Sequence, residues 1–153
     1  MLPGYNGYLE SENRRHEDRK ARDYLSERLQ DCKRDLQIYL KSRLAAGDFD
    51  VVLAGEKLRE QINHVQAKTL AALEGYSAKF DARKIDTDEL QKLVDIDSDL
   101  VSVVDRLQQE ILRRDTPHQE AIESGKSLNF EQANEWITMY RNRFDKRSQL
   151  LAK

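Results

Sequence analysis

The chain has 153 residues, about the size of one domain, and nothing along it marks a second domain. Charged residues make up 35%, hydrophobic residues 39%, and there are only 6 Gly and 2 Pro. This balance favours long amphipathic helices and excludes a collagen-like or disulfide-stapled chain. The 26 basic and 28 acidic residues leave a net charge of -2. No overall field therefore points to nucleic acid or an acidic membrane as partner.

The sequence predicts a cytoplasmic protein. No apolar run approaches the roughly 18 residues that a membrane span requires. The first residues, Met1 to Gly7, lack the basic and then apolar regions of a signal peptide. The single cysteine, Cys32, has no partner for an internal disulfide, which agrees with a reducing compartment.

The first predicted helix covers residues 11–46, and we expect residues 1–10 to be flexible. Apolar residues follow one another at spacings of three and four, as on one face of a helix. They are Leu25, Leu29, Cys32, Leu36 and Tyr39. The first half has almost no such stripe, although Asp18 and Arg22 stand at the supporting i,i+4 spacing. We expect that half to be solvated or to project beyond the bundle.

The second predicted helix covers residues 50–80, after a turn that contains Gly47 and the possible N-caps Asp48 and Asp50. Such a short turn makes the first two helices antiparallel neighbours. The helix carries a stripe that includes Leu58, Ile62, Val65 and Thr69.

The third predicted helix covers residues 86–115. Asp86 can cap it, Glu89 can complete the capping box, and Ile85 can pack on Leu90. Its apolar residues occupy two adjacent stripes, a face wide enough to contact two neighbours. We therefore expect this helix to be the central one.

The remainder of the chain predicts a broken fourth element, a short helix at residues 117–124 and a last helix at residues 130–151. Thr116-Pro117 starts the short helix and Gly125 ends it. The stripe of the last helix consists of Ala133, Ile137, Tyr140 and Phe144, with Trp136 beside it. The predicted fold class is all-α, a single antiparallel up-and-down helical bundle of three long helices plus this fourth element.

No segment predicts a catalytic, metal or cofactor site. The histidines lie on three different helices, and Glu60 with His64 supplies only two possible ligands. Asp95, Asp97 and Asp99 copy the opening of a calcium loop but lack its Gly and its final Glu. Within a helix these carboxylates are better explained as a solvated acidic face. We expect no enzyme, no cofactor and no metal, with Cys32 a buried and inert thiol.

Basic residues gather in the first and last helices, mixed with acids in the first. The cluster in the last helix, next to its aromatic residues, is the better candidate for contact with a partner. The predicted partner-binding residues are Trp136, Tyr140, Arg141, Arg143, Phe144 and Arg147. The three aromatic residues share one helical face, which favours a place in the core over a stacking platform.

These observations predict a non-enzymatic protein that binds another protein, as adaptors or chaperones do. Weak homodimerisation is compatible with this prediction. In architecture alone the predicted hairpin with a last helix that can detach resembles small export or secretion chaperones, and no motif carries this resemblance. The last helix either covers a partner groove or is a permanent core element, and the aromatic stripe favours the core. The alternative is a nucleic-acid-associated protein that uses the basic ends of the first and last helices; an enzyme or metal protein is the least supported class.

Overall fold

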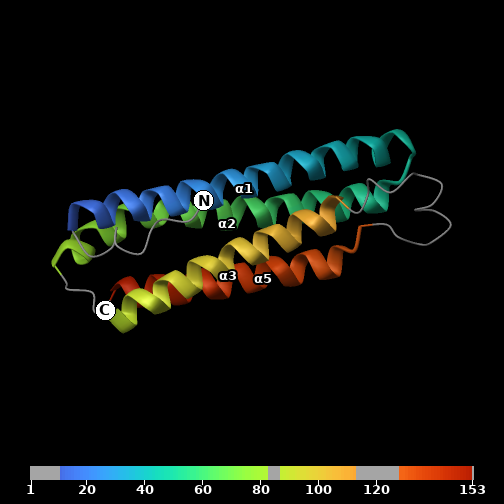
Figure 1. The fold of residues 1–153 in the computed structure, drawn as a ribbon. Helices are drawn as coiled ribbons and strands as arrows, with labels where there is room; N and C mark the ends of the chain where they lie inside the picture. The colour runs from blue at the N-terminus through green and yellow to red at the C-terminus, as the bar shows by residue number, and fades with distance from the viewer. Residues whose placement is uncertain (1–10, 83–86, 113–127, 153) are drawn as a thin grey trace.

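The computed structural model describes residues 11–82, 87–112 and 128–152, and all but a few of these are helical. The four helices are α1 (Ser11–Ala45), α2 (Phe49–Ala82), α3 (Thr87–Leu112) and α5 (Phe130–Ala152). They form one all-α bundle, as predicted, and the described residues contain no strand (Figure 1). The predicted short helix at 117–124, the flexible segment 1–10 and the cap at Asp86 lie outside the described residues.

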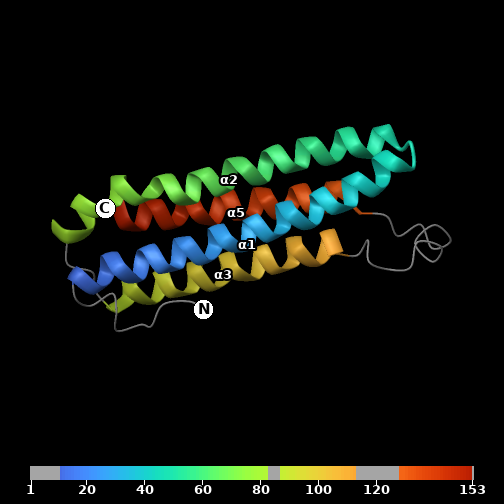
Figure 2. The same cartoon turned by 90° about the horizontal axis from the view of Figure 1, so that it is seen from above.

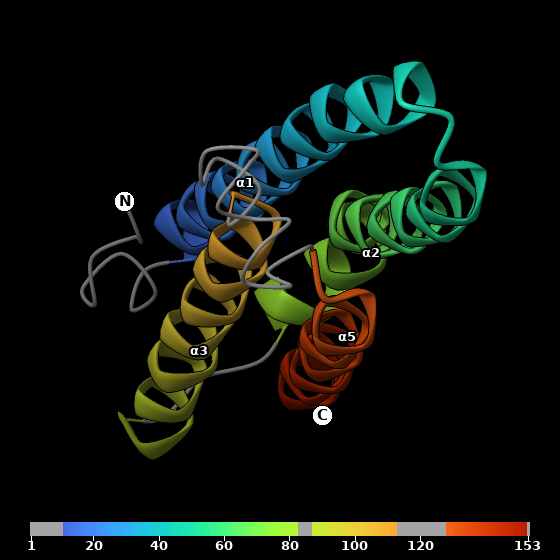
Figure 3. The ribbon, with the colours of Figure 1, turned by 90° about the vertical axis from the view of Figure 1, so that its right-hand side faces the viewer.

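The helices form a ring in the order α1, α2, α5, α3. The packed pairs are α1 with α2, α2 with α5, α5 with α3, and α3 with α1. In Figure 1, α1 and α3 run in one direction while α2 and α5 run in the other, and the end view of Figure 3 shows the ring. The expectation that α3 has two neighbours is confirmed, but α3 is not central. Every helix of the ring has two neighbours, because α5 is a full fourth member of the bundle.

Gly47 and Asn129 direct the chain at two helix ends. Gly47 has a φ of 77°, the left-handed conformation that commonly ends a helix, and its N–H bonds the Leu44 carbonyl at 3.0 Å. Asn129 caps α5, because its side-chain oxygen accepts the N–H of Gln132 at 3.0 Å. The buried Glu110 of α3 accepts the backbone N–H of Asn129 at 3.1 Å, which ties the end of α3 to the start of α5.

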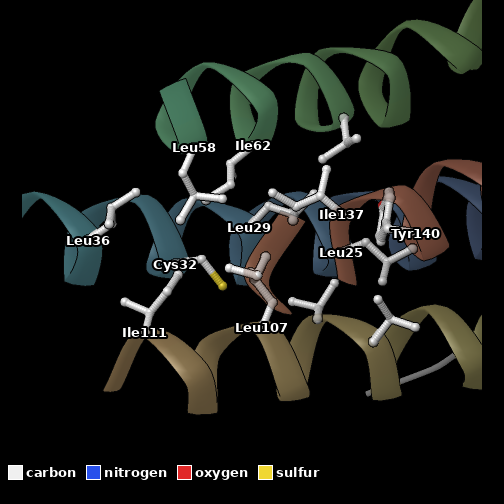
Figure 4. Packing of buried hydrophobic residues seen from close by; sticks show 14 of the residues in the cluster. Leu25, Leu29, Cys32, Leu36, Leu58, Ile62, Leu107, Ile111, Ile137 and Tyr140 are labelled. Carbon is white, nitrogen blue, oxygen red and sulfur yellow. The ribbon is translucent and has the colours of Figure 1, made fainter. Parts of the chain in front are cut away.

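The main hydrophobic core contains residues from all four helices. A second, smaller cluster lies between the start of α3 and the end of α5. Figure 4 shows Leu25 and Leu29 of α1, Leu58 and Ile62 of α2, Leu107 of α3 and Ile137 and Tyr140 of α5 in the main core. Helices α1 and α2 approach closely at Gly55, where an added Cβ would overlap the side chain of Leu40. Both stripes of α3 are covered within the chain, by α1 and α5.

No helix among the described residues is long and apolar enough to cross a membrane.

Candidate functional site

The first half of α1 does not project from the bundle, which corrects the prediction for it. Asp18, Ala21 and Arg22 are all buried. The predicted pair forms, with Arg22 Nη2 2.8 Å from Asp18 Oδ2, but inside the protein instead of on its surface. The reason is that α3 and α5 bring further charged side chains to this end of the bundle.

Arg147 of α5 is fully buried, with 0% of its surface exposed. Its Nε donates to Asp97 Oδ1 of α3 at 2.7 Å, and its Nη2 donates to Asp18 Oδ1 of α1. The guanidinium presents its donors in a rigid planar fork, so two carboxylates from two helices fix its orientation. Asp18, Arg22, Asp97 and Arg147 form what we call the buried ionic network.

The prediction of a solvated acidic face on α3 is wrong for Asp97, which belongs to the buried ionic network. Asp95 and Asp99 are exposed as expected, whereas Asp97 is only 2% exposed. Asp97 is two positions from both Asp95 and Asp99. A helix turns about 100° per residue, so alternate positions face different sides. The charge run was a correct sign of polarity but a wrong guide to exposure at its central residue.

A second buried polar pair lies in the core between α2 and α5. Tyr140 Oη is 2.6 Å from Thr69 Oγ1, which itself lies 2.7 Å from the Val65 carbonyl. Thr69 has one hydroxyl hydrogen and donates it to that carbonyl, so Tyr140 is the donor of the pair. Burial raises the pKa of the Tyr140 phenol, so the hydroxyl keeps its proton.

The predicted partner-binding residues are distributed between core and surface. Tyr140, Phe144 and Arg147 are buried, and the rings of Tyr140 and Phe144 stack with centroids 6.1 Å apart. Trp136 is half-buried under the guanidinium of Arg106, which lies 5.2 Å from the ring centroid. The half-buried Arg141 donates to Gln61 of α2 at 2.8 Å, and Arg143 lies 3.5 Å from Asp99.

Exposed apolar side chains instead gather where α1 turns into α2. Leu44 is 53% exposed, and Phe49 and Leu53 are each 63% exposed. We call these three residues the hairpin-tip patch. Phe49 and Leu53 are four residues apart and share a face of α2. Helices α1 and α2 extend beyond the described ends of α3 and α5 at this end (Figures 1 and 2). In the sequence, the apolar residues from Leu44 to Leu53 flank the turn at Gly47, and the turn signal gives no indication of their exposure.

Cys32 lies in the core among Leu29, Leu107 and Ile111, as Figure 4 shows. Burial raises the pKa of its thiol to about 12, and the nearby Arg28 guanidinium acts in the opposite direction. Since an unfolded thiol ionises near pH 8.5, this group favours the unfolded state increasingly as the pH rises from there toward 12.

We predict that the native protein resists thiol-specific reagents at pH 8, because the reactive thiolate is absent and the sulfur is buried. The measurement is the rate of modification by a chromogenic disulfide in buffer and in denaturant. Modification in buffer should proceed no faster than unfolding. Rapid modification of the native protein would show that Cys32 is accessible.

The described residues hold no group of three or more His, Cys, Asp or Glu side chains placed to bind one metal ion. His16 and His64 are exposed, and His118 lies outside the described residues. The shallow surface hollow next to His64 is lined only by residues of α2: Asn63, His64, Gln66, Ala67 and Leu70. No Asp, Glu, Lys or Arg is among these lining residues.

Comparisons with known proteins add no relative: no protein-family model matches the chain, and neither a curated protein nor a solved structure matches it.

Proposed function

We propose that this protein is a non-enzymatic helical bundle that binds another protein through its hairpin-tip patch. The observation that carries the proposal is the position of the exposed large apolar residues. Five are strongly exposed in the described chain, and Leu44, Phe49 and Leu53 fall within ten residues of each other. Clustered exposed apolar side chains mark interaction surfaces, whereas single ones need no explanation.

The underside of α5 is a weaker candidate for the partner groove. Ala133, Ile137, Tyr140 and Phe144 are each 2% exposed or less, so the space beneath this helix is filled by the core. Arg147 adds ion pairs to α1 and α3. Releasing α5 would expose both the core and two buried carboxylates. These contacts support α5 as a permanent element and favour the tip as the adaptor-like or chaperone-like contact.

The alternative, nucleic-acid association, has fewer cations at its disposal than the sequence indicated. Arg22 and Arg147 are buried in the ionic network, and Arg141 and Arg143 contact Gln61 and Asp99. Arg19, Lys20 and Lys146 are exposed. Binding that weakens steeply with salt would favour this alternative.

We test the proposal with a photo-reactive phenylalanine analogue at Phe49 in the full chain, irradiated in an extract of the source cells. We expect discrete protein adducts from this position. The matched control carries the analogue at Leu70, which is 44% exposed on the same helix. Leu70 lies about 25 Å from Leu53 along the helix axis, at 1.5 Å per residue.

The double variant Phe49→Ser/Leu53→Ser should lose the partner identified by cross-linking, while Leu70→Ser should bind it as the unaltered chain does. All three positions are on the surface, so the melting temperature of each variant should stay nearly unchanged. Equal adduct patterns at Phe49 and Leu70, or full binding by the double variant, would exclude the tip as the contact surface.

A further inference from the structure

The buried ionic network occupies places that the helix pattern reserves for apolar residues. Most buried residues of α1, α3 and α5 fall in series with an interval of seven, as in a coiled coil. In α1 the two series are 18, 25, 32, 39 and 22, 29, 36. In α3 they are 90, 97, 104, 111 and 93, 100, 107, and in α5 they are 133, 140, 147 and 137, 144, 151. Asp18, Arg22, Asp97 and Arg147 are the charged members of these series.

All four charged positions fall in the same layer at one end of the bundle. Arg147 of α5 links α3 and α1 in this layer. Its Nε donates to Asp97 of α3, and its Nη2 donates to Asp18 of α1. Asp18 also holds Arg22 on its own helix. The two acids and two bases of the network balance in charge.

Apolar residues that repeat every seven positions do not by themselves define the axial register, that is, how far one helix is shifted along its neighbour. A shift of one repeat, about 10 Å at 1.5 Å per residue, places apolar residues opposite apolar residues again. Apolar contact is also non-directional, so it tolerates the change. A charged layer present once along the series does not, because after such a shift each charge would face an apolar residue.

A buried ion pair is a weak source of stability, because removing its charges from water costs about as much as their attraction returns. Polar residues at single core positions are known instead to define register in coiled coils. We infer that the buried ionic network sets the axial register of α3 and α5 against α1, and that it does so at little gain in stability. This inference is independent of the function proposed for the hairpin tip.

Cross-linking between surface cysteines measures the register directly. In a Cys32→Ala background, the native pair is Arg28→Cys with Asp105→Cys, since these side chains form an ion pair between α1 and α3. The pair for the shifted register is Arg28→Cys with Ser98→Cys, one repeat earlier on α3. With the network intact, only the native pair should form a disulfide.

The test variant replaces the network by apolar residues, Asp18→Leu, Arg22→Leu, Asp97→Leu and Arg147→Met, so that its two acids and two bases are removed together. We expect it to stay helical with a melting temperature no lower than before, and its shifted pair to cross-link to an extent comparable with the native pair. The control variant Thr69→Val/Tyr140→Phe removes the other buried polar pair and should cross-link only in the native register.

Three outcomes would overturn the inference. The apolar variant could keep the native pair alone, which would show that packing sets the register. It could fail to fold, which would show that the network is needed for stability. Finally, the control variant could cross-link in both registers. This would show that removing any buried polar pair loosens the register, and that the ionic network has no special role.

Discussion

Replacing Arg147 by methionine should lower the free energy of unfolding by about 3–5 kcal/mol, the usual cost of breaking a buried ion pair by removing one partner. Asp97 would lose the Nε donor at 2.7 Å, and Asp18 would keep only Arg22. Most of this loss comes from leaving a carboxylate in the core without its cation. That free-energy cost is larger than the cost of losing the hydrogen bond itself.

Equilibrium unfolding in urea, followed by circular dichroism, measures this loss. Arg141→Met is the matched control, because Arg141 is half-buried on the same helix and makes one hydrogen bond, to Gln61. We expect the control to cost about 1 kcal/mol or less. Similar losses for the two variants would mean that Arg147 is not held by its two carboxylates in solution.

Ending the chain at Gly125 should abolish cooperative folding. The truncation removes α5, which packs on both α2 and α3 and supplies Ile137, Tyr140 and Phe144 to the core. Full loss of such side chains costs roughly 3–5 kcal/mol each for the large ones, and net stabilities of domains are only about 5–15 kcal/mol. The sum of these losses exceeds what a domain of this size can tolerate.

Thermal melting followed by circular dichroism at 222 nm decides the outcome of the truncation. We expect a shallow, non-cooperative change for the truncated chain, and an unchanged sharp transition for a control chain that ends at Leu151. A truncated chain that still melts cooperatively would show that α1, α2 and α3 fold without α5. The last helix would then be a cover over a groove.

The sequence was sufficient to predict the helices because their signals are local. Stripes at spacings of three and four, Gly47 after α1 and the cap Asn129 each act within a few residues of the helix that they define. The ring order was not predictable in this way. Which helices are neighbours depends on how complete faces fit together, and a wide apolar face on α3 is compatible with more than one arrangement.

The buried ionic network was missed because charge was interpreted as exposure. Asp18 and Arg22 continue the series of Leu25 and Leu29 at an interval of seven, and Arg147 continues that of Tyr140. A charged residue in an apolar series was therefore a usable signal. Its partners could not be deduced, however, since Asp97 and Arg147 meet through packing between residues far apart in the chain.

The hairpin-tip patch cannot be predicted from apolar character alone. Val51 and Leu53 belong to the same short stretch of α2, yet Val51 is partly buried and Leu53 is exposed. The two residues are two positions apart, so they face different sides of α2, at the end where α1 and α2 extend past the described ends of α3 and α5 (Figure 1). Relative helix ends are a property of the assembled bundle.

We expect α5 to be a permanent member of a cooperative four-helix bundle and to unfold together with the other three helices. Trp136, the single tryptophan, lies on α5 under Arg106 and reports on that helix in the unmodified protein. The most direct test is to follow its fluorescence and the circular dichroism at 222 nm in one thermal scan. We expect both signals to change at the same midpoint with the same steepness. A fluorescence change that is complete before helix is lost would show that α5 leaves the bundle first, and would contradict the account.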